Sequence, residues 1–434
     1  MLKRFIKYVS QNMLGMLGMS FYILADTFFI SKAVGADGIT ALNLVLPLYN
    51  LIFAIGAMIG VGSAIRYVVE RGRNEKAAGG YFFHAIAWAL IISSVFVLAG
   101  AFIPDKIIAL LGGDETIVNT GKNYTRIFMM FAPFFMCNYI CNAFVRNDGN
   151  PSIAMAATLF SSLFNVVFDY VLMFPLGLSM SGAALATALS PIIGVLICCI
   201  HFKSEKCSIS FKPVGLSIKK LIYSCQVGVS AFVGEISSGV ITVAFNMIIL
   251  GLAGNVGVAA YGVVANISLV AVALFNGIAQ GSQPLVSYHY GKEDHTGCQK
   301  LLRYALTTVC IFAPALFLLV FFFAPQIVRT YLSHAGDELI AYSIGAFRRY
   351  SVSYLLLGFN IVIGGFMTAI ERPVPAICIS VGRGLALQSA VLLLLAAIFG
   401  GDAVWYTPIF SEALCLVMSL LFLRSYRRQT DMQA

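Results

Sequence analysis

The chain has 434 residues, of which 59% are hydrophobic and only 11% are charged, and its mean hydropathy is +0.89. This composition excludes an ordinary soluble globular protein and indicates a polytopic membrane protein. The net charge of +9 does not indicate nucleic-acid binding, because the basic residues lie in short clusters between apolar segments and form no concentrated basic face. The ten cysteines follow no disulfide or metal-binding spacing, which favours packing roles for them.

Twelve apolar segments follow one another along the chain. Each reaches or exceeds the roughly 20 residues that a helix needs to cross the hydrocarbon layer. We therefore predict an all-α membrane protein with twelve transmembrane helices. The predicted spans are 5–31, 38–66, 80–103, 123–145, 151–174, 181–202, 219–250, 256–288, 299–323, 344–369, 374–398 and 403–423.

The basic residues predict how the chain is inserted. Lys and Arg concentrate at both chain ends and in 66–76, 203–220 and 292–303, and Arg146 falls on the same side. Because cytoplasmic loops are enriched in Lys and Arg, we expect both termini to be cytoplasmic. The first segment lacks a signal-peptide cleavage site, so it is predicted to stay as a helix in the plasma (inner) membrane.

The second half of the chain repeats the first. Landmarks recur 219 residues later: Gly35 as Gly254, Gly62-Ser63 as Gly281-Ser282, and Gly72 as Gly291. Further along the chain the spacing drifts to 221–223, with Pro104 as Pro325, Asp114-Glu115 as Asp337-Glu338 and Pro151 as Pro373. Since each unit has an even number of spans, the copies insert the same way up, which gives two six-helix lobes related by a pseudo-two-fold axis along the membrane normal. We predict an N-terminal lobe at 1–202, a cytoplasmic linker at 203–218 and a C-terminal lobe at 219–434. The pattern favours a transporter with substrate between the lobes, although a duplicated structural bundle would show the same repeat.

Asp169 is a carboxylate deep inside an apolar run that spans 152–174. Such residues are costly in lipid and mark ion or substrate pathways. Asn165 lies one helical turn before it, and counting the rise per residue from the outer ends of their spans places Asp26 and Thr187 at the same depth. We expect these four side chains to form one polar layer in the outer half of the first lobe. The alternative for Asp26 is a helix-end residue that faces the outer headgroups.

Three motifs together resemble the multidrug and toxic compound extrusion (MATE) family. They are Ala-Asp-Thr-Phe-Phe-Ile at 25–30 followed by Gly35, the Asn165 and Asp169 pair, and the Gly-Asn-Pro turn at 149–151. The acidic residues of the first half resemble the DinF-like and MepA-like bacterial branches. The resemblance covers essentially the whole chain, and it implies that Asp26, Asn165, Asp169 and Thr187 form a proton or sodium site.

The chemistry of these residues suits either ion. Two neighbouring carboxylates in a low dielectric cannot both ionise cheaply, which permits proton loading and release. The same carboxylates, with an amide and a hydroxyl oxygen, are hard ligands for a metal cation such as sodium. The sequence does not choose between them.

The second lobe offers a weaker set of polar residues, Glu235, Asn360 and Arg383. The resemblance implies a cation or substrate role for Glu235. The competing interpretation is structural, with Glu235 neutralising Arg383. No acid lies in the span that contains Asn360, and the repeat places Leu387 and Val391 where this lobe would hold the counterparts of Asn165 and Asp169.

Other side chains are candidates for a substrate cavity. Methionines at helical spacing in the first span and aromatic residues in the fourth could line an adaptable apolar pocket, although packing is the commoner meaning of such stripes. The candidates are Met16, Met19, Phe135, Asn138, Tyr139 and Asn142.

Taken together, these features predict a secondary active antiporter that exports organic, cationic or zwitterionic, amphipathic drugs or toxins in exchange for protons or sodium. Neither a Walker-type phosphate loop nor a zinc-protease motif is present, so we expect no enzyme activity, no ATP and no cofactor. We expect a monomer in the lipid bilayer. The alternative function is a lipid-linked saccharide flippase of the wider superfamily, which the single deep Arg383 disfavours because a pyrophosphate would need a cationic cavity.

Overall fold

The computed structural model describes residues 1–73, 78–211, 213–332 and 336–431. Within these ranges every regular element is a helix, as the sequence predicts. Residues 74–77 and 212, which belong to two of the basic stretches used to predict orientation, lie outside the described residues.

The first half of the chain forms eight helices. They are α1 (Leu2–Val34), α2 (Ala36–Arg73), α3 (Tyr81–Phe102), α4 (Pro104–Leu110), α5 (Glu115–Met130), α6 (Ala132–Asn147), α7 (Pro151–Met173) and α8 (Ser179–Phe202).

The second half forms the remaining elements. They are α9 (Ile218–Gly291), α10 (His295–Tyr331), α11 (Asp337–Ser351), α12 (Tyr354–Ala369), α13 (Pro373–Val381), the π-helical turn η1 (Gly382–Ala386), α14 (Leu387–Ile398), the 3₁₀ turn η2 (Gly401–Tyr406) and α15 (Thr407–Asp431).

Ten helical segments of the described chain are long and apolar enough to cross a membrane, and twelve spans result when each of two bent pairs counts as one. The prediction of twelve spans is confirmed in this form. The bent pairs are α5 with α6, at 48°, and α11 with α12, at 42°. The predicted starts at 123 and 344 miss the first turns of α5 and α11, because these turns are amphipathic and carry polar residues.

The two bends have different local causes. Pro133 lies in the first turn of α6, where its ring and missing N–H prevent the helix from continuing through Phe131. The second bend contains no proline. There, Ser351 and Ser353 donate their hydroxyls to the carbonyls of Arg348 and Tyr350, and such local bonds compete with the helical ladder.

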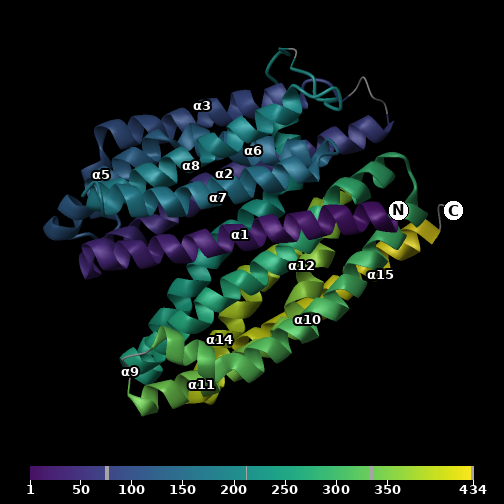
Figure 1. Ribbon diagram of the computed structural model, residues 1–434. Coiled ribbons are helices and arrows are strands. Elements are labelled where there is room, and N and C mark those ends of the chain that lie inside the picture. The colour runs from purple at the N-terminus through teal and green to yellow at the C-terminus, as the bar shows by residue number, and fades with distance from the viewer. Residues whose placement is uncertain (74–77, 212, 333–335, 432–434) are drawn as a thin grey trace.

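The helices form two bundles with α1 between them (Figure 1). One bundle contains α2–α8 and the other contains α9–α15. The helix α1 contacts both α7 and α9. Its first part contributes Phe5, Val9 and Met13 to the hydrophobic core of the second bundle, whereas Ile30 near its end belongs to the core of the first.

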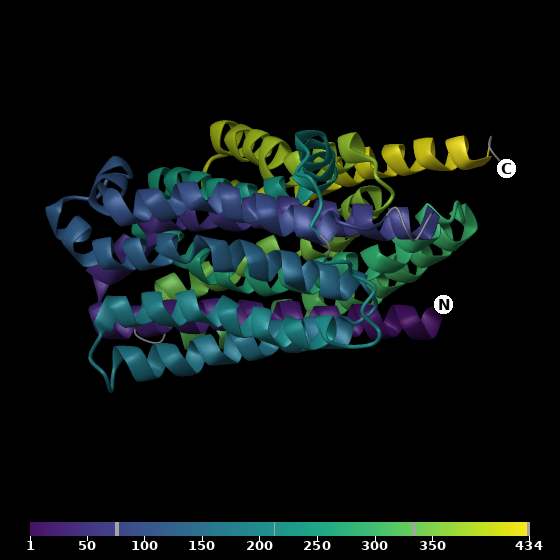
Figure 2. The ribbon, with the colours of Figure 1, turned by 90° about the horizontal axis from the view of Figure 1, so that it is seen from above.

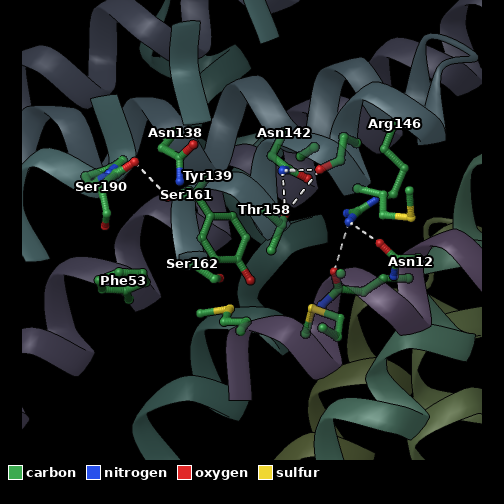
Figure 3. Close-up of a pocket in the computed structure, with 18 of the residues that line it drawn as sticks. Asn12, Phe53, Asn138, Tyr139, Asn142, Arg146, Thr158, Ser161, Ser162 and Ser190 are labelled. Atoms are coloured by element: carbon green, nitrogen blue, oxygen red, sulfur yellow. Dashed lines mark hydrogen bonds between the residues drawn. The ribbon is translucent and has the colours of Figure 1, made fainter. Parts of the chain in front are cut away.

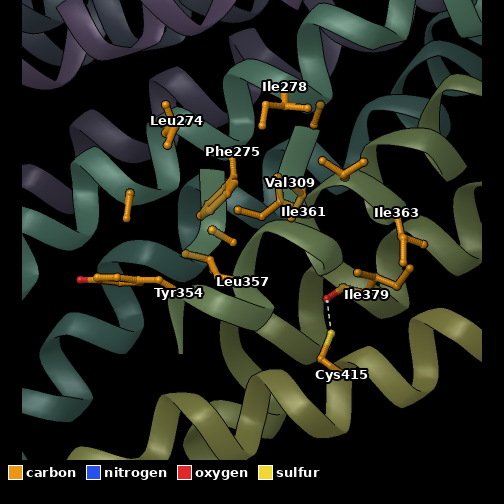
Figure 4. Close-up of a cluster of buried hydrophobic side chains, with 14 of the residues drawn as sticks. Leu274, Phe275, Ile278, Val309, Tyr354, Leu357, Ile361, Ile363, Ile379 and Cys415 are labelled. Atoms are coloured by element: carbon orange, nitrogen blue, oxygen red, sulfur yellow. Dashed lines mark hydrogen bonds between the residues drawn. The ribbon is translucent and has the colours of Figure 1, made fainter. Parts of the chain in front are cut away.

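The core of the second bundle is apolar and tightly packed (Figure 4). Phe275 from α9, Val309 from α10 and Leu357 from α12 meet in it, all of them buried. Further out, Cys415 of α15 donates its thiol to the carbonyl of Ile379 at 3.7 Å, so this cysteine has a packing role.

Both termini lie at the same end of the molecule (Figures 1 and 2), as an even number of spans requires. Glycines bring the bundles into backbone contact toward this end. A Cβ atom on Gly62 of α2 would collide with the carbonyl of Ser224, and one on Gly228 of α9 would collide with the carbonyl of Met58. Without side chains, the two helices approach much more closely than ordinary residues allow.

The repeat is visible in the backbone. Gly35 separates α1 from α2 with φ 75°, and Gly254 interrupts α9 with φ 59°. Both values lie in the left-handed region that favours glycine. The glycines matched in the sequence therefore form equivalent turns, and α9 contains two of the predicted spans.

Candidate functional site

The predicted polar layer comes together where α1 packs against α7 and α8 of the first bundle. Asp26 lies on α1, Asn165 and Asp169 lie one turn apart on α7, and Thr187 lies on α8. Asn165 and Asp169 are fully buried and Thr187 is 3% exposed. Asp26 is only half-buried as a residue, but its Oδ1 is enclosed. Depth counting therefore placed these four side chains together correctly, while their role in ion coupling remains a prediction.

The amide of Asn165 connects α7 to α8. In the orientation that satisfies both of its atoms, its nitrogen donates to Oδ2 of Asp169 at 3.1 Å. Its oxygen then accepts the hydroxyl and the backbone N–H of Thr187, each at 3.3 Å. Asn165 thus holds the Asp169 carboxyl in place across the helix pair.

The two carboxyl groups, of Asp26 and Asp169, are in contact across the boundary between α1 and α7. One oxygen of each, Oδ1, is buried and has no hydrogen-bond partner. Two negative charges held this close repel each other strongly, and a proton or a cation between them removes the repulsion. With the amide and hydroxyl oxygens beside them, the residues fit either ion.

Tyr22 was not singled out from the sequence. It lies one turn before Asp26 on α1, bonds to the hydroxyl of Tyr49 at 3.1 Å, and lines the central cavity. The phenol thus stands between the acid pair and the cavity.

The cavity lies between α1, α2, α6, α7, α8 and α9 and has a volume of about 120 Å³ (Figure 3). Asn142 of α6 lies in the cavity wall and bonds to α7. It donates to the hydroxyl of Thr158 at 2.9 Å and to the carbonyl of Ala154 at 3.0 Å. All six residues proposed from the sequence line this cavity: Met16, Met19, Phe135, Asn138, Tyr139 and Asn142.

Arg146, which was counted from the sequence among the basic residues that predict orientation, also lines the cavity. The residue is 5% exposed and projects from α6 (Figure 3). Its Nη1 donates to Asn12 of α1 and to Gln280 of α9, each at 3.1 Å. The signal that could have found it is its position directly after an apolar run, three residues before the Gly149 turn.

Glu235 lines the same cavity from α9. Among the described residues, no hydrogen bond or ion pair to Glu235 is present. The predicted pairing of Glu235 with Arg383 is therefore wrong. Arg383 instead lies 3.9 Å from Glu412 of α15, because the turn η1 directs its side chain toward that helix.

The three polar residues predicted in the second lobe, Glu235, Asn360 and Arg383, therefore do not form one site. Asn360 donates to Oε2 of Glu412 at 2.7 Å and accepts the hydroxyl of Ser419 at 3.0 Å. Asn360 and Arg383 thus meet through Glu412, and Glu235 lies apart in the central cavity. The charges of this cluster neutralise each other, which indicates a structural role.

A further group of possible metal ligands lies in the first bundle, toward the end of the molecule that holds the termini. Asp148, His201 and Cys207 place one ligand atom each within 4.8 Å of one another. However, Asp148 already accepts four hydrogen bonds, from Tyr67 and Arg71 at 2.7 Å, from His201 at 2.8 Å and from the N–H of Ser208 at 2.9 Å. Its lone pairs are used, so the cluster anchors the linker to α2 and α8 and leaves no carboxylate oxygen free for a metal.

Two bundles of membrane-spanning helices, a cavity between them lined by apolar and polar side chains, and a buried acid pair beside it define the class of the protein, a polytopic membrane transporter. The MatE family profile matches residues 12–171 and 231–392, once in each half. The chain therefore belongs to the MatE family, which confirms the resemblance seen in the sequence.

Curated relatives of similar length are named multidrug export protein MepA. One from Staphylococcus saprophyticus is 24% identical over 412 residues, covering 94% of this chain and 90% of the relative. One from Staphylococcus aureus is also 24% identical, over 417 residues, with the same coverage.

Solved structures show the same fold. An outward-facing multidrug resistance MATE family transporter of the MOP superfamily superposes with a TM-score of 0.93 at 20% identity, covering 99% of this chain and 96% of that one. A MOP superfamily transporter from Pyrococcus furiosus, with a binding pocket described as reversed in polarity, gives 0.91 at 20% identity with the same coverage.

Proposed function

We propose that the protein is a secondary active exporter of organic amphipathic compounds, driven by the inward movement of protons or sodium ions. The observation that carries this proposal is the contact between Asp26 and Asp169 next to the central cavity. An ion that binds the acid pair changes the charge of a buried site on α1, and the same helix lines the cavity with Met16, Met19 and Tyr22.

The helix α1 supplies a physical route for coupling. It packs against α7 of the first bundle and α9 of the second, so a shift of α1 changes both the acid pair and the contact between bundles. Loading a proton or a sodium ion between Asp26 and Asp169 removes their repulsion and lets α1 and α7 approach. In an alternating-access cycle, this approach would accompany substrate release.

The lining of the cavity supports a broad substrate range. Thioethers, aromatic rings and amides offer adaptable apolar contact with few fixed bonds. The curated relatives are named multidrug export proteins, which supports drugs or toxins as substrates. The proposal includes an ion gradient as the energy source in place of ATP, a monomer, and insertion in the plasma membrane with both termini cytoplasmic.

One observation favours the flippase alternative. Arg146 adds a cation to the central cavity, as a pyrophosphate would need. Glu235 lines the same cavity, however, and its negative charge would repel such a group. The exporter is therefore the better-supported function.

The test uses purified protein in sealed vesicles that contain a fluorescent cationic dye. A proton gradient and a sodium gradient are imposed separately, and dye movement is recorded. We expect transport with one of the two ions and its loss in Asp26→Asn and Asp169→Asn. Asp105→Asn, at an exposed acid of α4, is the matched control and keeps full activity. Ion-dependent transport in both site variants would refute the assignment of the acid pair, and dye movement that ignores both gradients would refute the exporter.

A further inference from the structure

We propose that Arg146 binds the acidic group of zwitterionic substrates in the central cavity and so selects them over simple cations. This inference rests on the proposed function, because it assigns a specificity-determining residue to the same cavity. The acidic group is a carboxylate or a phosphate, the two anions that fit a guanidinium.

Arg146 is a buried cation without an acidic partner. Its two hydrogen bonds go to neutral amide oxygens, those of Asn12 and Gln280. Its Nε is enclosed and has no partner at all. Within the described residues no carboxylate forms an ion pair with it. Because a guanidinium stays charged at physiological pH and buried charges are normally paired, the site lacks an anion.

The cavity supplies room for that anion. Arg146 lines the free space beside Tyr139 and Asn142 (Figure 3). A planar guanidinium can bond to a carboxylate or phosphate through two parallel N–H groups. The Nε–H has no protein partner, and it becomes one donor of such a pair when the side chain shifts to meet the acid. The bonds to Asn12 and Gln280 hold the other side of the group and fix its orientation.

Glu235 provides the opposite charge in the same cavity. It comes from α9, and Tyr139 lies close to both Glu235 and Arg146. The two charged groups do not pair with each other in the structure. A ligand with an amine at Glu235 and an acid at Arg146 would neutralise both charges at once, whereas a simple cation would leave Arg146 unpaired.

A structural role for Arg146 would have a different consequence. Its bonds join α6 to α1 and α9, so the residue could act only as a brace between bundles. Loss of a brace would weaken binding of every substrate to a similar extent. Loss of an anion-binding group would weaken binding of acidic substrates alone, and a matched pair of ligands therefore separates the two roles.

The experiment measures binding of two xanthene dyes by fluorescence polarisation in detergent. One is a cationic dye with a free carboxylate, and the other is its ethyl ester, which has the same ring system and positive charge. We expect the wild-type protein to bind the free acid about tenfold more tightly than the ester, equivalent to about 1.4 kcal/mol. Arg146→Gln should lose this preference while its affinity for the ester stays within about twofold.

Three further variants complete the design. Arg146→Lys keeps the charge but loses the planar pair of donors, so the preference should fall to a value between those of the wild type and Arg146→Gln. An unchanged preference in Arg146→Lys would contradict the two-donor contact, which provides a second test where Arg146→Gln fails to fold. Glu235→Gln should weaken both dyes alike, because both carry the cation. Arg126→Gln, at an exposed arginine of α5, is the matched control and changes neither affinity.

A second pair of ligands distinguishes the source of the acid. Dodecylphosphocholine and dodecyltrimethylammonium share a chain and a quaternary ammonium, but only the former carries a phosphate. Preference for the free-acid dye alone identifies a carboxylate, and preference for the phosphocholine alone identifies a phosphate. Equal binding within both pairs by the wild type would overturn the inference. In that case ion-driven export of the ester would leave the proposed function standing, whereas failure to transport any dye would count against the function itself.

Discussion

Arg66 of α2 and Glu371, in the turn after α12, form an ion pair at 2.7 Å that joins the two bundles. Arg66 also lies 3.4 Å from Glu70 and stacks over the ring of Tyr223 at 4.7 Å. The pair lies toward the same end of the molecule as the glycine contacts. This end is therefore closed by charge as well as by backbone packing.

The backbone of Glu371 has a left-handed conformation. Glu371 has φ 53°, and its counterpart in the first half of the repeat, Gly149, has φ 99°. A non-glycine residue in the left-handed region costs on the order of 1 kcal/mol. The second half therefore carries a strained acid where the first half has a glycine, and the acid contacts the opposite bundle.

The first prediction concerns this ion pair. Glu371→Gln should open the closed end by removing a half-buried bridge, with a change of about tenfold in the population of open molecules, or about 1.4 kcal/mol. Distances between spin labels on the two bundles measure that population. The exchanged pair Arg66→Glu with Glu371→Arg should restore closure, and Arg424→Gln, at an exposed arginine of α15, is the control. Unchanged distances in Glu371→Gln would contradict a gating role.

The second prediction concerns the glycine contact. Gly62→Ala should abolish transport, because its methyl group collides with the backbone of Ser224 and the bundles cannot close. Gly262→Ala, elsewhere in α9 with open space around it, should transport normally. Both variants are compared by dye transport and by thermal unfolding. Normal transport by Gly62→Ala would show that the close approach is not needed in the cycle.

The third prediction concerns the buried amide. Asn165→Ala should remove the bonds to Asp169 and Thr187 and destabilise the protein by about 1–3 kcal/mol, since the buried carboxyl loses a donor. Thermal unfolding in detergent measures the loss, and ion-driven dye transport should fall at the same time. Asn119→Ala, at an exposed amide of α5, should leave both unchanged. Full transport in Asn165→Ala would remove this residue from the proposed coupling site.

The fourth prediction concerns pH and the start of α10, outside the membrane spans. The backbone N–H of Gly297, with a smaller contribution from His289, holds the pKa of Asp294 below its usual value. The folded pKa is thus lower than the unfolded one. The resulting stability is present above about pH 4 and is lost as the pH falls through the lower, folded pKa.

Two variants of Asp294 separate the stability that comes from the helix cap from the stability that comes from the carboxylate charge. Asp294→Ala should cost about 1 kcal/mol near neutral pH through loss of the helix cap. Asp294→Asn should retain the cap but lose the acid-dependent part, so its unfolding temperature should vary less with pH than that of the wild type below about pH 4. Identical pH profiles for Asp294→Asn and the wild type would show that Asp294 does not cause the dependence.

Much of the site could be predicted by counting along the chain. Asp26, Asn165, Asp169 and Thr187 meet because residues at equal distances from the ends of antiparallel or parallel spans share a depth, whatever the packing. The repeat also predicts apolar residues at the equivalent positions of the second half. Leu387, at the position equivalent to Asn165, packs against the hydrophobic core of the second bundle.

Other contacts between side chains could not be predicted by counting residues along the helices. Arg146 and Glu235 face one cavity because α6 and α9 are rotated to direct them there, and Arg383 meets Glu412 because of the π-helical turn at Gly382–Ala386. Rotation about a helix axis depends on the contacts of the whole bundle, and a single unusual turn changes it. Depth alone leaves such partners undetermined.

The sequence by itself therefore determined the membrane class, the twelve spans, the duplication and the depth of the acid layer, since hydropathy and rise per residue are local properties. Only the tertiary structure decided which charges are paired, which face the cavity, and that the bundles close at the end that holds the termini. Those outcomes depend on how close two helices can come, and that distance is set by glycines such as Gly62 and Gly228 on different bundles.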